Sequence, residues 1–253
     1  MSAACYGFQG WRRSVASANT MKYIILSIAL VAAWLTDPVV QAQAVAANCG
    51  HPYDSPGRFG PFDYTDPSKK PELELVEPHH FTSYLEELAL YGIASRAASQ
   101  PEEAEGFALI GGNLDYTLHA FPNHSRALYA MGMWQLRQRK ERPLEAAGWV
   151  SGGKIYSAEC YFERAIMFKP DDGMVHHAYG AFLQKAGKQK QAAAEYERAI
   201  ALMPEFPEPH YNLGLLYIDS GDLAKAAEHA ARAYALGYPL DGLKRKLAAA
   251  QRR

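Results

Sequence analysis

The last third of the chain carries a hydrophobic pattern that recurs every 34 residues. Two stretches, 189–202 and 223–236, place apolar or small residues at i, i+4 and i+7, the spacing of one face of an α-helix. Two sets of alanines mark the period, namely Ala158, Ala192 and Ala226, and Ala165, Ala199 and Ala233. A fixed period of this length predicts a stacked repeat, in which each unit buries its apolar face against its neighbours.

Glycines and prolines divide each repeat into two helices. Gly187 and Gly221 have the same 34-residue spacing, and each follows a helical stretch. Glycine accepts the left-handed conformation that commonly follows a helix C-terminus. Pro170 and Pro204 close the second helix of their units, because proline cannot continue a helix. The pattern therefore predicts antiparallel helical hairpins repeated along an axis.

Two of these repeats, 171–204 and 205–238, resemble the tetratricopeptide repeat. The first matches the consensus at His176, Tyr179, Gly180, Leu183, Gly187, Ala192, Tyr196, Ala199 and Pro204. The second matches at Tyr211, Asn212, Leu213, Gly214, Leu215, Leu216, Tyr217, Gly221, Asp222, Ala226, Ala230 and Ala233. The resemblance implies an all-α fold, a right-handed α-solenoid of antiparallel helix pairs preceded here by an extended N-terminal segment.

A third repeat, 125–170, is predicted to be split by an insertion. Its second helix keeps Ala158 and Pro170, and its first helix is expected at 125–137 with Gly132 in the consensus place. Gly132 and Ala158 are 26 residues apart, whereas the matching Gly180 and Ala192 are 12 apart. The inserted stretch contains Pro143, Gly148, Gly152 and Gly153, and it is interpreted as a loop around Trp149.

The family resemblance also suggests where a partner would bind. In this family the first helix of each repeat lines the inner, concave surface. The matching positions here are Arg126, Tyr129, Met133 and Leu136, then Met174, His177, Ala181 and Gln184, then Glu208, Tyr211, Leu215 and Ile218. This row is largely apolar and aromatic, which suits an extended, proline-containing peptide. Asn212 resembles a carboxylate-clamp asparagine, but the lysines of such a clamp are missing from the matching positions, so no clamp is expected.

Upstream of the repeats, residues 79–124 are expected to form a divergent helical hairpin or an N-terminal helical cap. A helix is predicted to start near Thr82 or Ser83, because Ser83 and Glu86 have the spacing of a capping box. Its buried side is expected to carry Leu85, Leu88 and Tyr91. The glycines at 106, 111 and 112 make this hairpin less regular than the repeats.

Residues 239–253 are expected to form a capping helix. Leu240, Leu243 and Leu247 share one side, and basic residues lie elsewhere, as the polar-backed end of a solenoid requires. The basic residues at 244–246 and 252–253 could indicate a nucleic-acid site. They are interpreted as a solvated face, because no aromatic residues are interleaved with them to stack on bases. No nucleic-acid partner is therefore expected.

The first 44 residues have the pattern of a signal peptide. Residues 23–35 are nearly all apolar, with Met21 and Lys22 before them and Ala42-Gln43-Ala44 after them. This run is too short for a membrane span, which needs about 20 residues. We expect export, into a bacterial periplasm or otherwise out of the cytosol, with no membrane span left after cleavage. Met21 is an alternative start of translation.

Residues 45–78 are predicted to be an extended segment. Nine prolines and glycines between positions 50 and 78 oppose long helices. Tyr53, Phe59, Phe62 and Tyr64 are too apolar for a flexible linker, so this segment is expected to bury its rings against the helices. Two placements remain open: the segment occupies part of the concave groove and competes with a partner, or it packs on the outside or along one edge.

Cleavage after Ala44 would leave two of the three cysteines, Cys49 and Cys160. Thiols often pair in an oxidising compartment, which predicts a disulfide between them. In the alternative, Cys160 is a small residue packed in a helix.

Composition and motifs favour a binding protein over an enzyme. The 253 residues are 49% hydrophobic with a formal net charge of −1, as in an ordinary globular chain. No glycine-rich phosphate loop, nucleophile elbow or zinc-binding spacing is present in the sequence, so no catalytic residues, metal or cofactor are expected. The histidines at 176 and 210 occupy the same place in successive repeats, which is best explained by packing.

Two classes of function fit these features. The first is an exported scaffold or adaptor that binds a protein or peptide partner through its concave surface. The alternative is an accessory or regulatory subunit of an envelope enzyme, or a ligand-binding protein that uses the inserted loop and the N-terminal segment. The first is favoured, because the repeats supply an extended surface but no convergent acid, base or nucleophile. The oligomeric state does not follow from the sequence.

Overall fold

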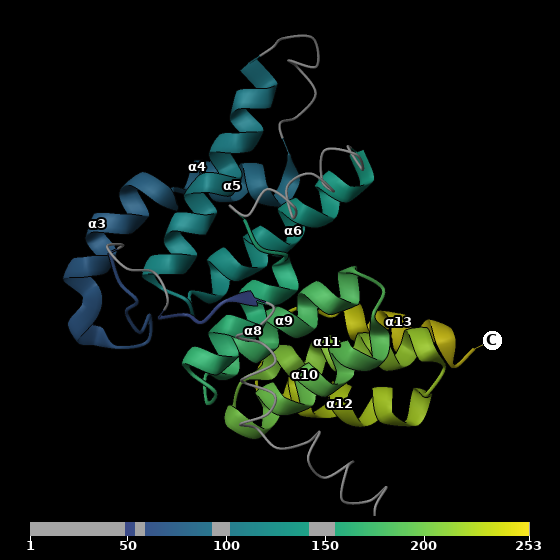
Figure 1. Cartoon of the computed structure of the whole chain (residues 1–253). Coiled ribbons are helices and arrows are strands. Elements are labelled where there is room, and N and C mark those ends of the chain that lie inside the picture. The colour runs from purple at the N-terminus through teal and green to yellow at the C-terminus, as the bar shows by residue number, and fades with distance from the viewer. Residues whose placement is uncertain (1–48, 54–58, 93–101, 142–154, 253) are drawn as a thin grey trace, which may run out of the picture. The chain divides into compact units, whose positions relative to one another are not determined.

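The computed structural model describes residues 49–53, 59–92, 102–141 and 155–252, all within one compact unit that spans 45–253. Regular structure in these ranges is helical throughout, which confirms the all-α prediction (Figure 1). In chain order the helices are η1 (Pro67–Lys69), α3 (Lys70–His80), α4 (Ser83–Tyr91), α5 (Glu102–Ala120), α6 (Ser125–Glu141), α8 (Ala158–Phe168), α9 (Gly173–Lys185), α10 (Gln189–Leu202), α11 (Pro207–Ser220), α12 (Leu223–Ala235) and α13 (Gly242–Ala250). The predicted signal peptide at 1–44 and the inserted loop around Trp149 lie outside the described residues.

The two regular repeats are the helix pairs α9–α10 and α11–α12. Each pair packs face to face, α9 also contacts α6 and α11, and α10 contacts α11, so consecutive pairs stack as in an α-solenoid (Figure 1). Gly187 and Gly221 stand just past the ends of the first helices, and their φ angles of 77° and 83° are left-handed. The amide of Lys188 donates to the Leu183 carbonyl and that of Asp222 to the Tyr217 carbonyl, closing both helix ends in the same way.

A second set of glycines lets large side chains pack directly on a helix backbone. A Cβ atom at Gly132 would lie 2.6 Å from a ring carbon of Phe182, and one at Gly180 would lie 2.7 Å from the ring of Tyr196. Both distances are too short for real contacts, so glycine is required where these buried rings cross the helices. The consensus glycines therefore serve close packing, whereas Gly187 and Gly221 serve helix termination.

The split repeat is also a helix pair, α6–α8. The Gln135 side chain on α6 forms hydrogen bonds to the backbone of the residues that follow the insertion. Its Nε2 donates to the Tyr156 carbonyl at 2.8 Å, and its Oε1 accepts from the Ala158 amide at 2.8 Å. One buried side chain of the first helix thus fixes the start of the second helix, although the insertion separates them in sequence.

Residues 67–78, which we expected to be extended, form η1 and most of α3, so the prediction is wrong for this stretch. Proline does not prevent this helix. Pro71 stands in its first turn, where amide groups have no partner within the helix, and Pro78 stands in its last turn. Val76 is buried in a small core with Ala120 and Phe121, and this burial stabilises a helix that the composition disfavours.

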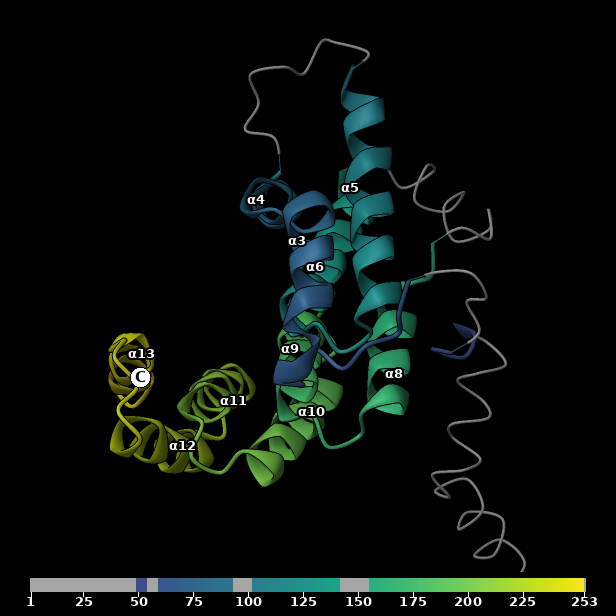
Figure 2. The same cartoon turned by 90° about the vertical axis from the view of Figure 1, so that its left-hand side faces the viewer.

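The hairpin upstream of the repeats consists of α4 and α5. Thr82 caps α4 by accepting a hydrogen bond from the Leu85 amide, as the predicted start near Thr82 or Ser83 implied. Helix α4 packs against α6, and α3 packs against α5 (Figure 2). Two expectations need correction: α5 is not interrupted by its glycines, and Tyr91 is 79% exposed rather than buried.

Helix α13 covers the last repeat, packing on both α11 and α12. Leu243 is fully buried against Gly214, and Leu247 is half-buried. Leu240 was expected on the same side, but it precedes the helix and is 59% exposed. Among the described residues, no helix combines the length and apolarity that crossing a bilayer would require.

Candidate partner-binding surface

The residues predicted to line the inner surface lie on α6, α9 and α11, the three first helices of the repeats. Because α9 contacts both α6 and α11, their rows are neighbours. Exposure differs along the surface: Arg126 and Met174 are exposed, and Tyr211 is only 9% exposed. The half-buried members are Tyr129, Met133, Leu136, His177, Ala181, Gln184, Glu208, Leu215 and Ile218.

At the α6 end, helix α4 extends this surface. Arg126 forms an ion pair with Glu86 of α4, and its guanidinium lies 5.4 Å from the Phe81 ring centre. The Arg137 side chain donates to the Leu88 and Ala89 carbonyls at the end of α4. These contacts fix α4 beside α6 in the way that α6 lies beside α9, so α4 acts as a further first helix.

Helix α4 also carries two exposed tyrosines, neither of which is among the residues predicted to line the inner surface. Tyr84 is 67% exposed and Tyr91 is 79% exposed. Burial, with a smaller electrostatic contribution from nearby Tyr91, raises the pKa of Tyr129 on α6. The only feature of the sequence that pointed to this part of the surface was the capping pattern that predicted α4. The side of α4 that faces solvent depended on its packing against α6.

In the middle of the surface, His177 links two repeats. The Asn212 amide donates to its Nε2 at 3.1 Å, and the Phe206 ring stands edge-on at 5.4 Å. Burial lowers the pKa of His177 to about 4, so its ring is neutral at pH 7. Asn212 therefore connects first helices, in place of the carboxylate clamp whose lysines are missing.

At the α11 end, part of the predicted row is already covered by the chain itself. The Tyr211 ring stacks on Tyr238 with centroids 4.1 Å apart, and both pack in a small core with Leu215, Ile218 and Leu243. Tyr211 therefore supports α13 more than it faces a partner. Leu215 and Ile218 remain half-exposed beside it.

The charges along the inner surface are few and partly paired. Arg126 is neutralised by Glu86, and His177 is uncharged at pH 7. Glu208 is the acidic member of the row. The remaining members of the row are apolar or neutral, so this face favours an uncharged ligand segment over a phosphorylated or strongly acidic one.

The aromatic segment lies at the turns between helices. The Phe62 amide donates to the Ala120 carbonyl at 2.7 Å, and the rings of Phe62 and Tyr64 contact Phe121. Tyr64 also stacks on His124 at 4.0 Å. Residues 59–66 therefore pack along one edge of the helices, which agrees with the second of the two placements considered; residues 54–58 lie outside the described residues.

A buried asparagine joins this segment to two turns. Asn123 accepts from the Tyr64 amide at 2.9 Å and donates to Asp63 at 2.8 Å and to Asp172 at 2.9 Å. Asp63 also pairs with Lys169, and these hydrogen bonds outweigh burial and lower its pKa to about 2. Asp172 caps α9. Asn123 thus ties the N-terminal segment, the α5–α6 turn and the start of α9 together.

The predicted disulfide between Cys49 and Cys160 is present, with Cα atoms 5.1 Å apart. It anchors the start of the segment to α8, a second helix, and Arg164 of the same helix donates to the Cys49 carbonyl at 3.5 Å. Glu163 lies close to both sulfur atoms, and these three residues form the one group of three potential metal ligands found among the described residues. Because the disulfide removes both thiolates, this group offers no metal site in its oxidised form.

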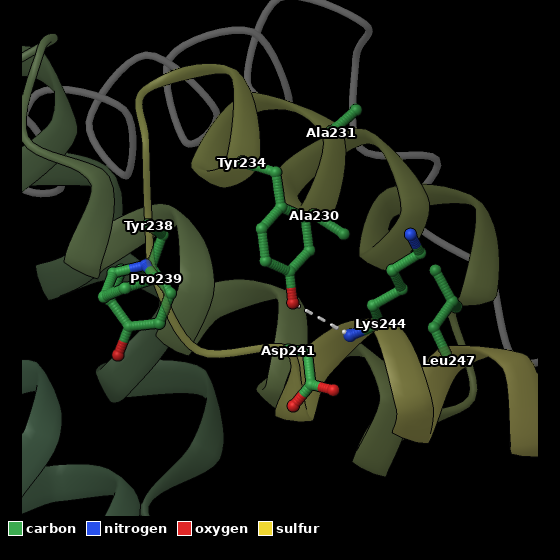
Figure 3. A pocket seen from close by; sticks show the side chains of 8 residues that line it. All are labelled: Ala230, Ala231, Tyr234, Tyr238, Pro239, Asp241, Lys244 and Leu247. Atoms are coloured by element: carbon green, nitrogen blue, oxygen red, sulfur yellow. Dashed lines mark hydrogen bonds between the residues drawn. The ribbon is translucent and has the colours of Figure 1, made fainter.

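A pocket of about 440 Å³ opens between α12 and α13 (Figure 3). Tyr234 lies at its centre, where its hydroxyl donates to the Leu240 carbonyl and accepts from the Lys244 amide. This pocket was not predictable from the sequence, since the way α12 and α13 approach each other depends on how α13 is turned. Both hydrogen bonds of the Tyr234 hydroxyl therefore stabilise the turn that leads into α13.

Comparison with known proteins supports the assignment of the repeats. A family model described as "TPR repeat" matches residues 180–221, from the middle of α9 to the end of α11. A search of curated proteins finds no match to this chain.

Proposed function

We propose that this chain, which matches a tetratricopeptide-repeat family model over residues 180–221, is an exported scaffold that binds an extended, mostly uncharged segment of a partner protein. Repeats of this family are typically non-catalytic modules for protein–protein interaction. The proposed surface runs across α4, α6, α9 and α11. Export is supported by the signal-peptide pattern of the first 44 residues and is compatible with the disulfide, because disulfides persist in oxidising compartments.

One observation carries the binding proposal: a row of half-exposed apolar side chains crosses neighbouring first helices. Met133 on α6, Met174 and Ala181 on α9, and Leu215 on α11 all keep some solvent exposure. Methionine side chains adapt to partners of different shape. A partner that covers this row would remove its apolar surface from water, and each fully buried large side chain contributes roughly 1.5–3 kcal/mol before the costs of association.

The proposal is tested by adding charge to the inner surface. Met174→Lys combined with Leu215→Lys places two ammonium groups on the row, and the long lysine side chains can extend to water without unfolding the helices. A matched control, Ala194→Lys with Ala201→Lys, adds the same charge to exposed positions of the second helix α10. Thermal unfolding of both variants verifies that they remain folded.

The readout is crosslinking and mass spectrometry in the native host. We expect the wild type and the α10 control to capture the same partners and the inner-surface variant to lose them. Capture of identical partners by both variants would show that the inner surface is not the binding site. The N-terminal peptide of the mature protein, identified in the same experiment, tests export: a start at Val45 is expected, and a chain that keeps residues 23–35 would contradict it.

A further inference from the structure

A pair of histidines joins the two helices of the last repeat. His210 on α11 and His229 on α12 face each other with their Nδ1 atoms 3.0 Å apart. His210 is 8% exposed, and His229 is half-buried with its ring stacked on Tyr217. Both rings are thus positioned by packing on helices that contact each other along their length.

The preceding repeat shows what this position usually holds. There His176 on α9 contacts Glu195 on α10, with Nδ1 and Oε2 2.7 Å apart. Glu195 and His229 are 34 residues apart, so the last repeat carries a second imidazole where the previous repeat has a carboxylate. The hydrogen bond between helices is kept in both repeats, but only the last one brings together two nitrogen atoms that can both act as metal ligands.

We propose that His210 and His229 form a two-nitrogen binding site for a divalent transition metal that takes cis ligands, copper(II) or nickel(II). Metal–imidazole bonds are about 2.0–2.1 Å long, so nitrogen atoms 3.0 Å apart subtend roughly 90–97° at a shared metal. This angle fits neighbouring positions of a square-planar or tetragonal site better than the roughly 109° of a tetrahedral zinc site. Solvent would supply the other ligands.

The surroundings allow both imidazoles to bind as neutral ligands. A neutral imidazole binds a metal through the lone pair of a ring nitrogen, and each of these two rings can offer one such nitrogen. On binding, the ring that carries hydrogen on Nδ1 would transfer it to Nε2, and both rings would turn so that their Nδ1 lone pairs, which lie along the hydrogen bond in the metal-free protein, converge on the metal. Of the nearby charges, Glu228 and Glu197 favour a cation. Lys225 and Arg232 oppose it, but each forms its own ion pair, with Asp222 and Glu205 respectively.

The site is tested on the full mature chain, purified without a histidine tag. Isothermal titration with CuCl₂ and, separately, NiCl₂ is expected to show one site, and saturating copper is expected to raise the Tm by roughly 5–10 °C. Copper electron paramagnetic resonance should show hyperfine coupling to two nitrogens. His229→Gln keeps a hydrogen-bond acceptor but removes one ligand, so copper affinity should fall at least about tenfold, because the second bond of a chelate forms intramolecularly.

The preceding repeat provides the matched gain of function. Glu195→His places a second imidazole opposite His176 and is expected to raise the copper stoichiometry from one to two. His210→Gln should behave like His229→Gln, which guards against one variant being misfolded. Unchanged copper affinity and stoichiometry in both glutamine variants would place the metal at other histidines and overturn the proposal. A stoichiometry of one copper in Glu195→His would contradict the argument that two facing imidazoles at this position of a repeat are enough to bind the metal.

Discussion

The buried His177 should make the stability of the repeats depend on pH. Its pKa is lowered from 6.5 to about 4 by burial. The unfolded chain therefore binds a proton at a higher pH than the folded chain does. The stabilisation from the neutral ring is complete above pH 6.5 and is lost as the pH falls toward 4. From these two pKa values, the loss relative to pH 7 is about 2 kcal/mol at pH 5 and about 3 kcal/mol at pH 4.

The assay compares the wild type with His177→Gln. Glutamine does not titrate, and its Oε1 can accept the hydrogen bond that Asn212 donates to the imidazole. Urea unfolding followed by circular dichroism at pH 7, 6, 5 and 4 should give free energies of unfolding within about 1 kcal/mol of each other at pH 7. At lower pH the wild type should lose more stability than the variant, by the amounts given above.

The difference between the wild type and His177→Gln isolates the contribution of the His177 ring to the pH dependence of stability. His124, His210 and His229 also have lowered pKa values because they are buried, and they steepen the pH dependence of both proteins equally. Free-energy curves that run parallel from pH 7 to pH 4 would refute the reasoning, because they would mean that His177 protonates alike in both states. An NMR titration of the His177 ring gives its folded-state pKa directly.

Three further predictions concern contacts that hold the fold together. Asn123→Ala removes three hydrogen bonds around a fully buried side chain and should lower the free energy of unfolding by about 2–4 kcal/mol in urea; a loss below 1 kcal/mol would mean that these bonds are not formed. Cys160→Ser opens a disulfide that spans 111 residues and should cost about 4–5 kcal/mol by loop entropy, so an unfolding midpoint unaffected by mutation or reduction would contradict the bridge. Gly132→Ala drives a Cβ into Phe182 and should cost about 1–3 kcal/mol, whereas Gly112→Ala, at an exposed helical position with open space, should stabilise by up to about 1 kcal/mol; equal shifts in thermal unfolding would show that the two glycines do not differ as described.

The repeat architecture could be predicted well because its signals are local and periodic. Gly187 and Gly221 end helices in the structure as their spacing indicated, and the pairs α9–α10 and α11–α12 follow the 34-residue period. The helix at 70–80 was missed, because the prolines are a local signal and the burial of Val76 against Phe121 is a distant one. A contact between residues so far apart in sequence leaves no mark on the pattern around either of them.

The sequence predicted which residues belong to the inner row, but it did not predict which of them are exposed to solvent. The family pattern placed Tyr211 on the inner row, whereas its stacking on Tyr238 depends on the path of the chain into α13. It could not show that α4 would present Tyr84 and Tyr91 to solvent. The same holds for His210 and His229: their positions in the repeat are visible in the sequence, but the 3.0 Å between their nitrogens is set by how α11 packs on α12.

The sequence by itself determined that this chain is a stack of helical pairs, because a fixed period with glycine and proline at matching places leaves few other ways to bury its alanines and rings. It also predicted the Cys49–Cys160 bridge, since only two cysteines follow the proposed cleavage site. Only the tertiary structure decided which inner residues face solvent, where the aromatic segment lies and which histidines meet. These outcomes depend on long-range packing, in which side chains from distant segments compete for the same buried space.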